Sequence, residues 1–416
     1  MVRVLVVDDS TFMRSAIVAL LEKDPEITVC GTAKDGRDCL DKVAQLQPDI
    51  ITLDVEMPRM DGLTTLKELM KTNPLPVLMV SSLTAEGAET TLKALEYGAL
   101  DFIAKVSGAD QEDFGVELRH KVKSISRRKA FLRLRYTRTN LEAGRSSSLS
   151  SSSAGSGLSG AGGTARPSGL TSSLGRSSVT SSLSGSTMSS LRQSGTASRP
   201  LRSTSSLTGA TSSQSSAASI IRPCTGSHDI VVIGVSTGGP PVVQKILSAL
   251  PANFPACILV AQHMPATFTG PFAKRLDSVC QISVTEAVNG DKIQNGHAYV
   301  CPGGKHIGIQ MRGPLPEVLV TPEPTSALYK PSVNVLMETA GNGLGRRVLG
   351  VMLTGMGSDG CEGAKVLKQK GGYLIAQNEA SCVVYGMPKA VVDAGLADQI
   401  LDVDDIAKAI MACVKG

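Results

Sequence analysis

A serine-rich segment divides this chain and limits where it can fold. Ser fills 30 of the 77 positions from 144 to 220, and this stretch contains no aromatic residue. Its apolar residues occur singly, so the segment cannot bury enough surface to offset the entropy lost on ordering. We therefore expect a basic helical extension and a disordered linker over residues 126–225, and two separate domains over residues 1–125 and 226–416.

The positive charge of the chain is concentrated in two stretches. The net charge is +5, and residues 144–220 contain six Arg but no Lys, Asp or Glu, which leaves the rest of the chain close to neutral. A second basic run over residues 119–138 holds nine Lys or Arg and no acidic residue. We interpret this run as the solvated face of a helix that enters the linker, and not as a nucleic-acid patch, so we expect no nucleic-acid partner.

Compartment signals in the sequence favour a cytoplasmic protein. The chain contains no uncharged apolar run of 18 residues, and its first residues, "MVRVLVVDDS", carry two aspartates where a signal peptide would be apolar. The nine cysteines are scattered singly without a CxxC pair or a metal-ligand spacing. We expect them to be reduced thiols.

Short apolar runs alternate with amphipathic stretches over the first 125 residues. Runs of strand length separated by segments of helical spacing are typical of an α/β fold, and here they predict a doubly wound parallel sheet of five strands. The predicted strands lie within residues 2–9, 27–33, 49–55, 76–82 and 101–106.

Polar residues stand where these predicted strands end. Asp8 and Asp9 end the first, Asp54 the third, Ser81 the fourth and Lys105 the fifth. Because the carboxyl ends of parallel strands share one edge of a sheet, these side chains are expected to converge. Three carboxylates in one place repel each other unless a cation binds, and oxygen ligands of this kind suit Mg²⁺.

The same alternation resumes after residue 226, and a mostly parallel sheet flanked by helices is again expected. Here "GVSTGG" places Ser236 on a tight turn between a predicted strand, 229–235, and a predicted helix, 239–250. Such a turn exposes a serine nucleophile and aims the next amide, that of Thr237, at an oxyanion. A phosphate-binding turn has the same geometry, although neither GxGxxG nor GxxxxGK[ST] is present, and a structural turn is a third possibility.

A nucleophilic serine needs a base and an orienting acid, and two predicted strand ends offer a candidate for each. His297 and His306 lie in short strand-like runs whose placement the sequence does not fix, and Asp359 could also be a helix N-cap. His263 ends the predicted strand 256–263, and Asp359 lies in a glycine-rich loop after the predicted strand 346–355. Both would meet Ser236 at one sheet edge as a Ser-His-Asp triad. The order of these residues along the chain differs from that of the usual α/β-hydrolases, which predicts a separate hydrolase architecture.

Two sets of motifs resemble known families. "VLVVDDS", "DIITLDVEMPRMDG", "PVLMVSS" and "DFIAK" look like a response-regulator receiver domain of the flavodoxin-like fold. "IGVSTGGP", "AQHMP" and "MLTGMGSDG" look like the Rossmann-like catalytic domain of the chemotaxis protein-glutamate methylesterases, the CheB family. The resemblance covers both predicted domains in order and leaves only the serine-rich segment outside it.

The resemblance to a receiver implies that a histidine kinase phosphorylates Asp54. The implied Mg²⁺ ligands are Asp8, Asp9, Asp54 and the backbone carbonyl of Glu56. The implied phosphoryl contacts are Ser81 and Lys105, and the implied aromatic switch residue is Phe102.

The resemblance to the methylesterases implies a hydrolase that phosphorylation activates. Ser236, His263 and Asp359 would be its triad, and the backbone amides of Thr237 and Met356 its oxyanion hole. Its substrates would be γ-glutamyl methyl esters, and selected glutamines, on membrane chemoreceptors that the protein approaches from the cytoplasm, with no cofactor for the esterase step. The competing interpretations are a DNA-binding or a nucleotide-binding output domain behind the receiver.

Overall fold

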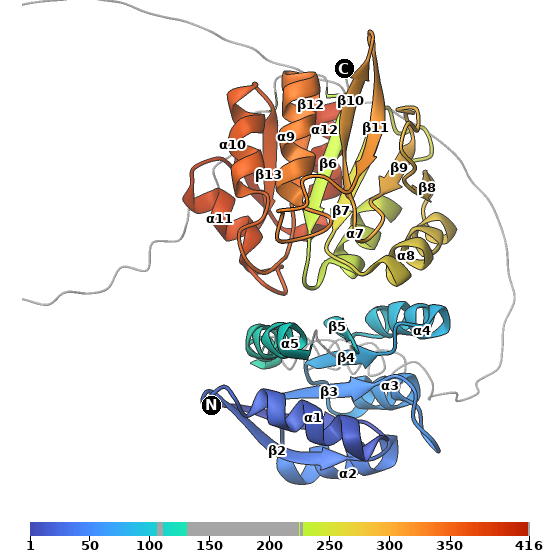
Figure 1. Ribbon diagram of the computed structural model, residues 1–416, viewed down its shortest axis with the longest axis vertical. Helices are drawn as coiled ribbons and strands as arrows, with labels where there is room; N and C mark the ends of the chain where they lie inside the picture. Colours follow the sequence, from blue (N-terminus) through green and yellow to red (C-terminus); the bar gives the residue numbers. More distant parts are fainter. Residues whose placement is uncertain (106–110, 131–223, 225–227, 415–416) are drawn as a thin grey trace, which may run out of the picture. The chain divides into compact units, whose positions relative to one another are not determined.

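The computed structural model describes residues 1–105, 111–130, 224 and 228–414, which form two folded parts (Figure 1). Each part is described by itself. The predicted disordered linker lies almost entirely outside the described residues.

The first part contains one parallel sheet in the strand order β2-β1-β3-β4-β5. The prediction of an α/β fold with five parallel strands is therefore confirmed. The strands are β1 (Val2–Val7), β2 (Ile27–Ala33), β3 (Ile50–Asp54), β4 (Val77–Ser81) and β5 (Asp101–Ala104). The helices are α1 (Thr11–Leu21), α2 (Gly36–Leu46), α3 (Gly62–Thr72), α4 (Ala85–Glu96) and α5 (Gln111–Ser126).

Alternation along the strands distributes the core of this part over both faces of the sheet. Val4 and Val6 of β1 belong to a cluster with buried residues of α1 and α5, whereas Leu5 and Val7 belong to a cluster that includes residues of α2, α3 and α4. Both faces of a parallel sheet are covered by helices in this way, which explains why its strands are almost continuously apolar. The acidic, basic and serine side chains of the predicted site lie at the strand ends, whereas Thr52 is a buried polar residue in the middle of β3.

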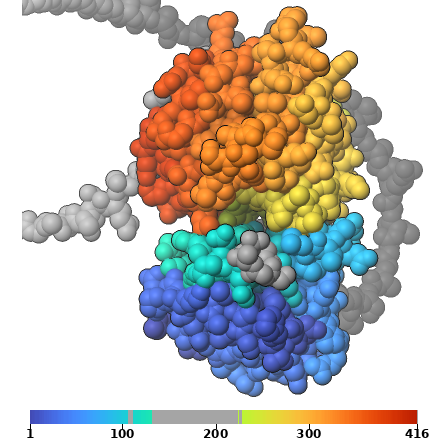
Figure 2. Space-filling view, in the orientation of Figure 1, coloured from blue at the N-terminus to red at the C-terminus, as the bar shows by residue number. Residues whose placement is uncertain are grey.

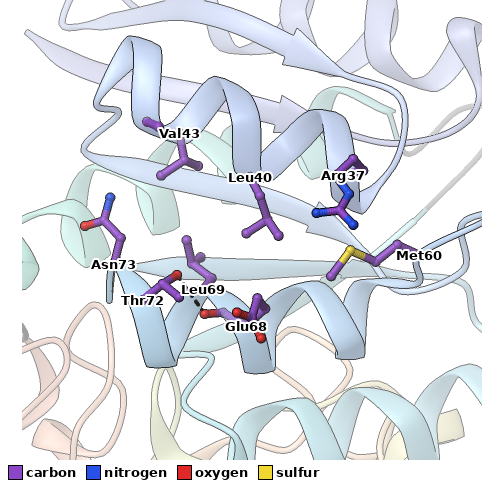
Figure 3. Close-up of a pocket in the computed structure, with 9 residues that line it drawn as sticks. Arg37, Leu40, Val43, Met60, Glu68, Leu69, Thr72 and Asn73 are labelled. Atoms are coloured by element: carbon purple, nitrogen blue, oxygen red, sulfur yellow. Dashed lines mark hydrogen bonds between the residues drawn. The ribbon is translucent and has the colours of Figure 1, made fainter.

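Helices α2 and α3 leave a groove between them with a volume of about 600 Å³. Figure 3 shows Leu40 and Val43 of α2 facing Leu69 of α3, with Arg37 and Glu68 also lining the groove. The groove contains none of the polar strand ends.

The basic run at the end of the first part is anchored by acids of the same part. Lys121 Nζ lies 2.7 Å from an oxygen of Asp101, and Lys129 Nζ lies 2.6 Å from an oxygen of Asp49. The side chains of Lys121 and Asp101 are only 12% and 3% exposed, so this position of the run is packed against the first part and is not on a solvated face. Residues 131–138 of the run lie outside the described residues.

The second part contains a seven-stranded parallel sheet in the order β14-β13-β12-β6-β7-β9-β8 and an antiparallel hairpin of β10 and β11. Its strands are β6 (Ile230–Val235), β7 (Cys257–Gln262), β8 (Ser283–Glu286), β9 (His297–Val300), β10 (His306–Arg312), β11 (Leu315–Thr321), β12 (Val348–Met352), β13 (Tyr373–Gln377) and β14 (Gln399–Leu401). Its helices are α7 (Gly239–Ser248), α8 (Ala266–Val279), α9 (Val333–Leu344), α10 (Cys361–Gln369), α11 (Met387–Asp393) and α12 (Val403–Val414), with a 3₁₀ turn at Gly345–Arg347. The mostly parallel sheet predicted for this part is confirmed.

Two groups of helices cover the two faces of the second sheet. Val231 and Ile233 of β6 cluster with buried residues of α7, α8 and α12, and Val232 clusters with those of α9, α10 and α11. The hairpin joins the second group, where α9 and α10 lie side by side (Figure 1). Its tip projects at the top of this part in orange (Figure 2), and Leu315 there is 68% exposed.

No helix within the described ranges combines the length and the apolar character that crossing a membrane requires.

Candidate active sites at two sheet edges

The turn after β6 presents Ser236 at the edge of the second sheet. The backbone amide of Ser236 donates to the carbonyl of Thr354, 3.0 Å away. Gly238 has a φ of 73°, a left-handed conformation that side chains rarely adopt, and α7 begins at the next residue. The glycine therefore allows the chain to turn from strand to helix within three residues, 236–238, and leaves the serine at the turn.

Ser236, His263 and Asp359 form one line of hydrogen bonds. The Nδ1 atom of His263 lies 3.1 Å from Ser236 Oγ, and its Nε2 atom lies 2.9 Å from Asp359 Oδ2. Strands β12, β6 and β7 are neighbours, and Val235 pairs with Gln262, so the residues that follow those two reach the edge together. The structure thus brings together the three residues that the sequence singled out.

The Asp359 carboxylate accepts three further hydrogen bonds from the start of α9. The hydroxyl of Ser332 and the amide of Asn334 donate to Oδ1 at 2.9 and 3.2 Å, and the amide of Val333 donates to Oδ2 at 2.7 Å. Burial acts to raise the pKa of Asp359, but the hydrogen bond and charge of His263 and the donors of α9 outweigh it and lower the pKa. Asp359 is therefore an anion held at the amino terminus of a helix.

Two backbone amides near Ser236 have free donors. Among the described residues, the amides of Thr237 and Met356 donate to no acceptor, and both residues lie outside the helices and strands. The hydroxyl of Thr354 donates to the carbonyl of Thr237 at 2.9 Å, which ties the turn after β6 to the loop that carries Met356. Amides of this kind are available to a developing negative charge.

The second group of polar residues lies at the edge of the first sheet. Lys105 Nζ is 2.7 Å from Asp54 Oδ2 and 2.9 Å from Asp8 Oδ2, and both carboxylates are almost completely buried. Burial raises the pKa of Asp54 to about 6, against the opposing effect of Lys105. Burial acts to lower the pKa of Lys105, but the two carboxylates outweigh it and raise the pKa.

Asp9 completes an acidic cluster with these residues. One oxygen from each of Asp8, Asp9 and Asp54 lies within 4.8 Å of the others, and Asp9 is exposed. Three carboxylates face one lysine, so the cluster carries excess negative charge. An all-oxygen donor set with this charge fits Mg²⁺.

Ser81, Phe102 and Glu56 are the remaining residues predicted for the first site. Ser81 ends β4, and its hydroxyl donates to the carbonyl of Gly87 at 3.3 Å. Phe102 lies on β5, and its carbonyl accepts a hydrogen bond from Lys121. Glu56 lies in the loop after β3, beside a hollow that Asp9 also lines.

Comparison with known proteins assigns each part to a family. Residues 231–410 match the family model of the CheB methylesterase, and residues 4–112 match that of the response regulator receiver domain. Over 99% of both chains, the protein is 53% identical to the protein-glutamate methylesterase/protein-glutamine glutaminase 2 of Nitratidesulfovibrio vulgaris. This chain belongs to the CheB family of protein-glutamate methylesterases.

Other members of the CheB family are similar to the whole or to part of this chain. The protein-glutamate methylesterase/protein-glutamine glutaminase of Lawsonia intracellularis is 47% identical over 100% of this chain and 99% of that protein. The crystal structure of the Thermotoga maritima CheB methylesterase catalytic domain is 39% identical, covers 44% of this chain and 98% of that one, and has a TM-score of 0.43. The family assignment makes the second part a hydrolase domain and disfavours a DNA-binding or nucleotide-binding output domain.

This CheB-family catalytic domain uses residues that the sequence did not single out. Gln262 is buried and its side-chain amide donates to the carbonyls of Ser236 and His263 at 3.0 and 3.1 Å. The ring of Tyr329 stacks on that of His263 with a centroid distance of 4.4 Å and an angle of 15°. Gln262 was visible in "AQHMP" next to the histidine, whereas Tyr329 lies in a loop without any motif.

Proposed function

We propose that this protein is a phosphorylation-activated hydrolase that demethylates γ-glutamyl methyl esters on chemoreceptors and deamidates selected glutamines there. The observation that carries the proposal is the line of hydrogen bonds from Ser236 through His263 to Asp359. The names of the relatives, which are methylesterases and glutaminases, support the substrate class.

The chemistry is acyl transfer through a covalent intermediate. Ser236 Oγ attacks the ester carbonyl while His263 Nδ1 takes its proton, and the imidazolium then protonates the methoxide, which leaves as methanol. A water molecule loses a proton to the same nitrogen as it attacks the acyl group, and the imidazolium returns this proton to Ser236 Oγ as the acyl–enzyme bond breaks and the glutamate is restored. A glutamine side chain follows the same course with ammonia as the leaving group.

Asp359 selects the tautomer of His263 that this reaction needs. Its anionic oxygen lies next to Nε2, so the neutral imidazole carries its proton there and leaves Nδ1 free to act as the base. In the serine-protease triad the two ring nitrogens have the opposite assignment. Because Asp359 accepts four hydrogen bonds and its pKa is lowered, it stays ionised at neutral pH.

The free amides of Thr237 and Met356 would stabilise the tetrahedral oxyanion. Removal of one donor from such a site typically lowers kcat by about 10²–10³-fold. The tie from Thr354 to the carbonyl of Thr237 supports this assignment, because it holds the two loops at a fixed separation.

The receiver would supply the control of this reaction. Asp54 would accept a phosphoryl group from a histidine kinase, and Asp8, Asp9, Asp54 and the carbonyl of Glu56 would hold Mg²⁺. The ion would supply positive charge for the transferred phosphoryl group. Lys105, which already contacts Asp54, would pair with the new anion.

Phosphorylation would also change the partner of Ser81. Its hydroxyl donates to the carbonyl of Gly87 in α4, and a phosphoryl oxygen on Asp54 would be a stronger acceptor. A move of Ser81 toward that anion would release its contact with α4 and give Phe102 on β5 a different neighbour. We propose this exchange as the step that changes the receiver surface.

The test is the release of labelled methanol from a methyl-labelled cytoplasmic fragment of a chemoreceptor. The full chain with Mg²⁺ and a small-molecule phosphodonor is expected to release methanol faster than the same chain without the phosphodonor. Asp54→Asn is expected to remove this difference but keep the basal rate, and the matched exposed variant Asp41→Asn is expected to behave as wild type. Absence of methanol release from the phosphorylated wild type would reject the proposal.

A further inference from the structure

His306 is a buried histidine outside the triad. It is the first residue of β10, its exposed fraction is 0%, and its Nδ1 atom accepts the backbone N–H of Ser332 at 3.0 Å. Its Nε2 atom lies 3.3 Å from the carbonyl oxygen of Pro324. An acceptor facing one nitrogen and a donor facing the other define a single neutral tautomer, with the proton on Nε2.

We infer that His306 is a positioning residue for the esterase reaction, whose neutral imidazole fixes Ser332 and thereby aims Asp359 at His263. The inference rests on the proposed function, because it assigns His306 to the same triad.

Ser332 is the point at which His306 and the triad meet. Its amide donates to His306 Nδ1, and its hydroxyl donates to Asp359 Oδ1 at 2.9 Å. Both bonds come from one residue at the N-cap of α9, so a displacement of its backbone moves both. The hydrogen-bonded path from Ser236 therefore continues beyond Asp359 to a second histidine.

Asn334, the second residue of α9, also fixes the loop of Asp359. Its Oδ1 atom accepts the amides of Gly360 and Gly363, at the start of α10, at 3.0 and 2.9 Å. Asp359 in turn accepts the amide of Asn334. A side chain of α9 therefore caps α10, a side chain from the loop before α10 caps α9, and His306 holds Ser332 at the N-cap of α9.

Protonation of His306 would break this arrangement. A proton on Nδ1 would point at the backbone N–H group of Ser332, and that N–H group would lose its acceptor. Three charged groups act on His306: Lys330 disfavours its protonation, and Asp359 and Glu323 favour it. Burial is the largest effect and, with Lys330, lowers the pKa of His306. The neutral form is therefore the one present at neutral pH.

Two variants at position 306 distinguish the role of the hydrogen-bond acceptor for Ser332 from the effect of the titratable imidazole. His306→Asn places an amide oxygen near the position of Nδ1, so it keeps an acceptor for Ser332 without a titratable group, and its kcat should stay within about threefold of wild type. His306→Leu removes the acceptor and should lower kcat by about tenfold or more at unchanged KM, because Ser332 no longer holds the Asp359 carboxylate in its orientation toward His263.

The pH profile of kcat, measured on the phosphorylated full chain, is the deciding measurement. Two histidines must be neutral in the wild type, so its acid limb should fall with a limiting slope of two protons. His306→Asn should fall with a slope of one. An acid limb of His306→Asn identical to that of the wild type would overturn the inference.

Ser332→Ala tests the inferred role of His306 if His306→Leu does not fold. It removes the hydroxyl but leaves the backbone amide, and it should lower kcat by about the same factor as His306→Leu, with the double variant no worse than either. Wild-type kcat in a folded Ser332→Ala variant would also overturn the inference. The proposed function fails separately, through full activity of Ser236→Ala.

Discussion

The Nδ1 atom of His263 lies 3.1 Å from Ser236 Oγ, and the two residues follow strands that are paired in register. Their meeting is therefore a property of the sheet and not of a flexible loop. Once the strand register has placed His263, only an acid that selects its tautomer is still needed. Asp359 is that acid, and it lies in the loop after β12, which is the neighbour of β6 on the side away from β7. Four predictions about this edge and its counterpart in the receiver follow from the contacts.

Gln262→Leu should lower both stability and kcat. The side-chain amide of Gln262 donates to the carbonyls of Ser236 and His263, and its loss leaves the partly buried carbonyl of His263 without this donor, whereas that of Ser236 keeps the amide of Gly239. The expected cost is about 1–3 kcal/mol, measured by urea unfolding of the full chain. Gln369→Leu, on an exposed position of α10, is the control and should be neutral. Equal stability of the two variants would contradict the role of Gln262.

Gly238→Ala should destabilise the serine turn more than Gly290→Ala destabilises its loop. Both glycines have a positive φ, 73° and 88°, so alanine at either position is destabilised by a similar backbone strain. A Cβ at Gly238 would overlap Val383, whereas one at Gly290 has no neighbour within 4 Å. Thermal unfolding should therefore show a cost of about 1 kcal/mol for Gly290→Ala and a larger one for Gly238→Ala. The opposite ranking would contradict this account of the turn.

Acid should loosen the start of α9. The pKa of Asp359 in the folded protein is below its ordinary value of 3.8, so the unfolded state binds the proton first and the stabilisation by Asp359 is present above about pH 4. It is lost as the pH falls through the lowered value. Amide hydrogen exchange should show the protection of Val333 and Asn334 falling in this range. In Asp359→Asn, protection that kept the same pH dependence would show that another group is responsible.

Mg²⁺ should stabilise the receiver through its acidic cluster. Binding to the folded state adds about 2.7 kcal/mol at a hundredfold excess over Kd, and chelation should remove it. Asp8→Asn should abolish the rise in melting temperature, because it removes a carboxylate from the cluster of Asp8, Asp9 and Asp54. Asp41→Asn, on an exposed face of α2, should leave the rise unchanged. A wild-type response in Asp8→Asn would place the ion elsewhere.

The sequence was sufficient to predict both sheets and the residues at their carboxyl ends. Strand length, helical spacing and polar strand ends are local properties of the sequence. Because parallel strands have their carboxyl ends at one edge of the sheet, the polar residues there lie close together. Ser236, His263, Asp54 and Lys105 were found in this way. The strand order of the second sheet was not, because pairing between distant strands leaves no local pattern. The hairpin of β10 and β11 was not predicted either, although only two residues separate these strands in the sequence.

The residues that hydrogen-bond to the catalytic residues were predicted less well, because their contacts depend on parts of the chain that are far apart in the sequence. Ser332 and His306 act on Asp359 from a helix start and a hairpin strand that only the tertiary fold brings near it. Neither residue lies in a sequence pattern that marks it as a site residue. Thr354 and Gln262 lie inside the recognised motifs, but their buried hydrogen bonds depend on the strand pairing around them.

The most direct test of the central claim is the initial rate of labelled methanol release by Ser236→Ala, measured on the full chain with Mg²⁺ and a phosphodonor. Loss of the nucleophile should lower this rate by about 10³-fold or more while the hydrogen-exchange protection of the catalytic domain stays as in wild type. A folded Ser236→Ala variant that releases methanol within about tenfold of the wild-type rate would contradict the assignment of Ser236 as the nucleophile.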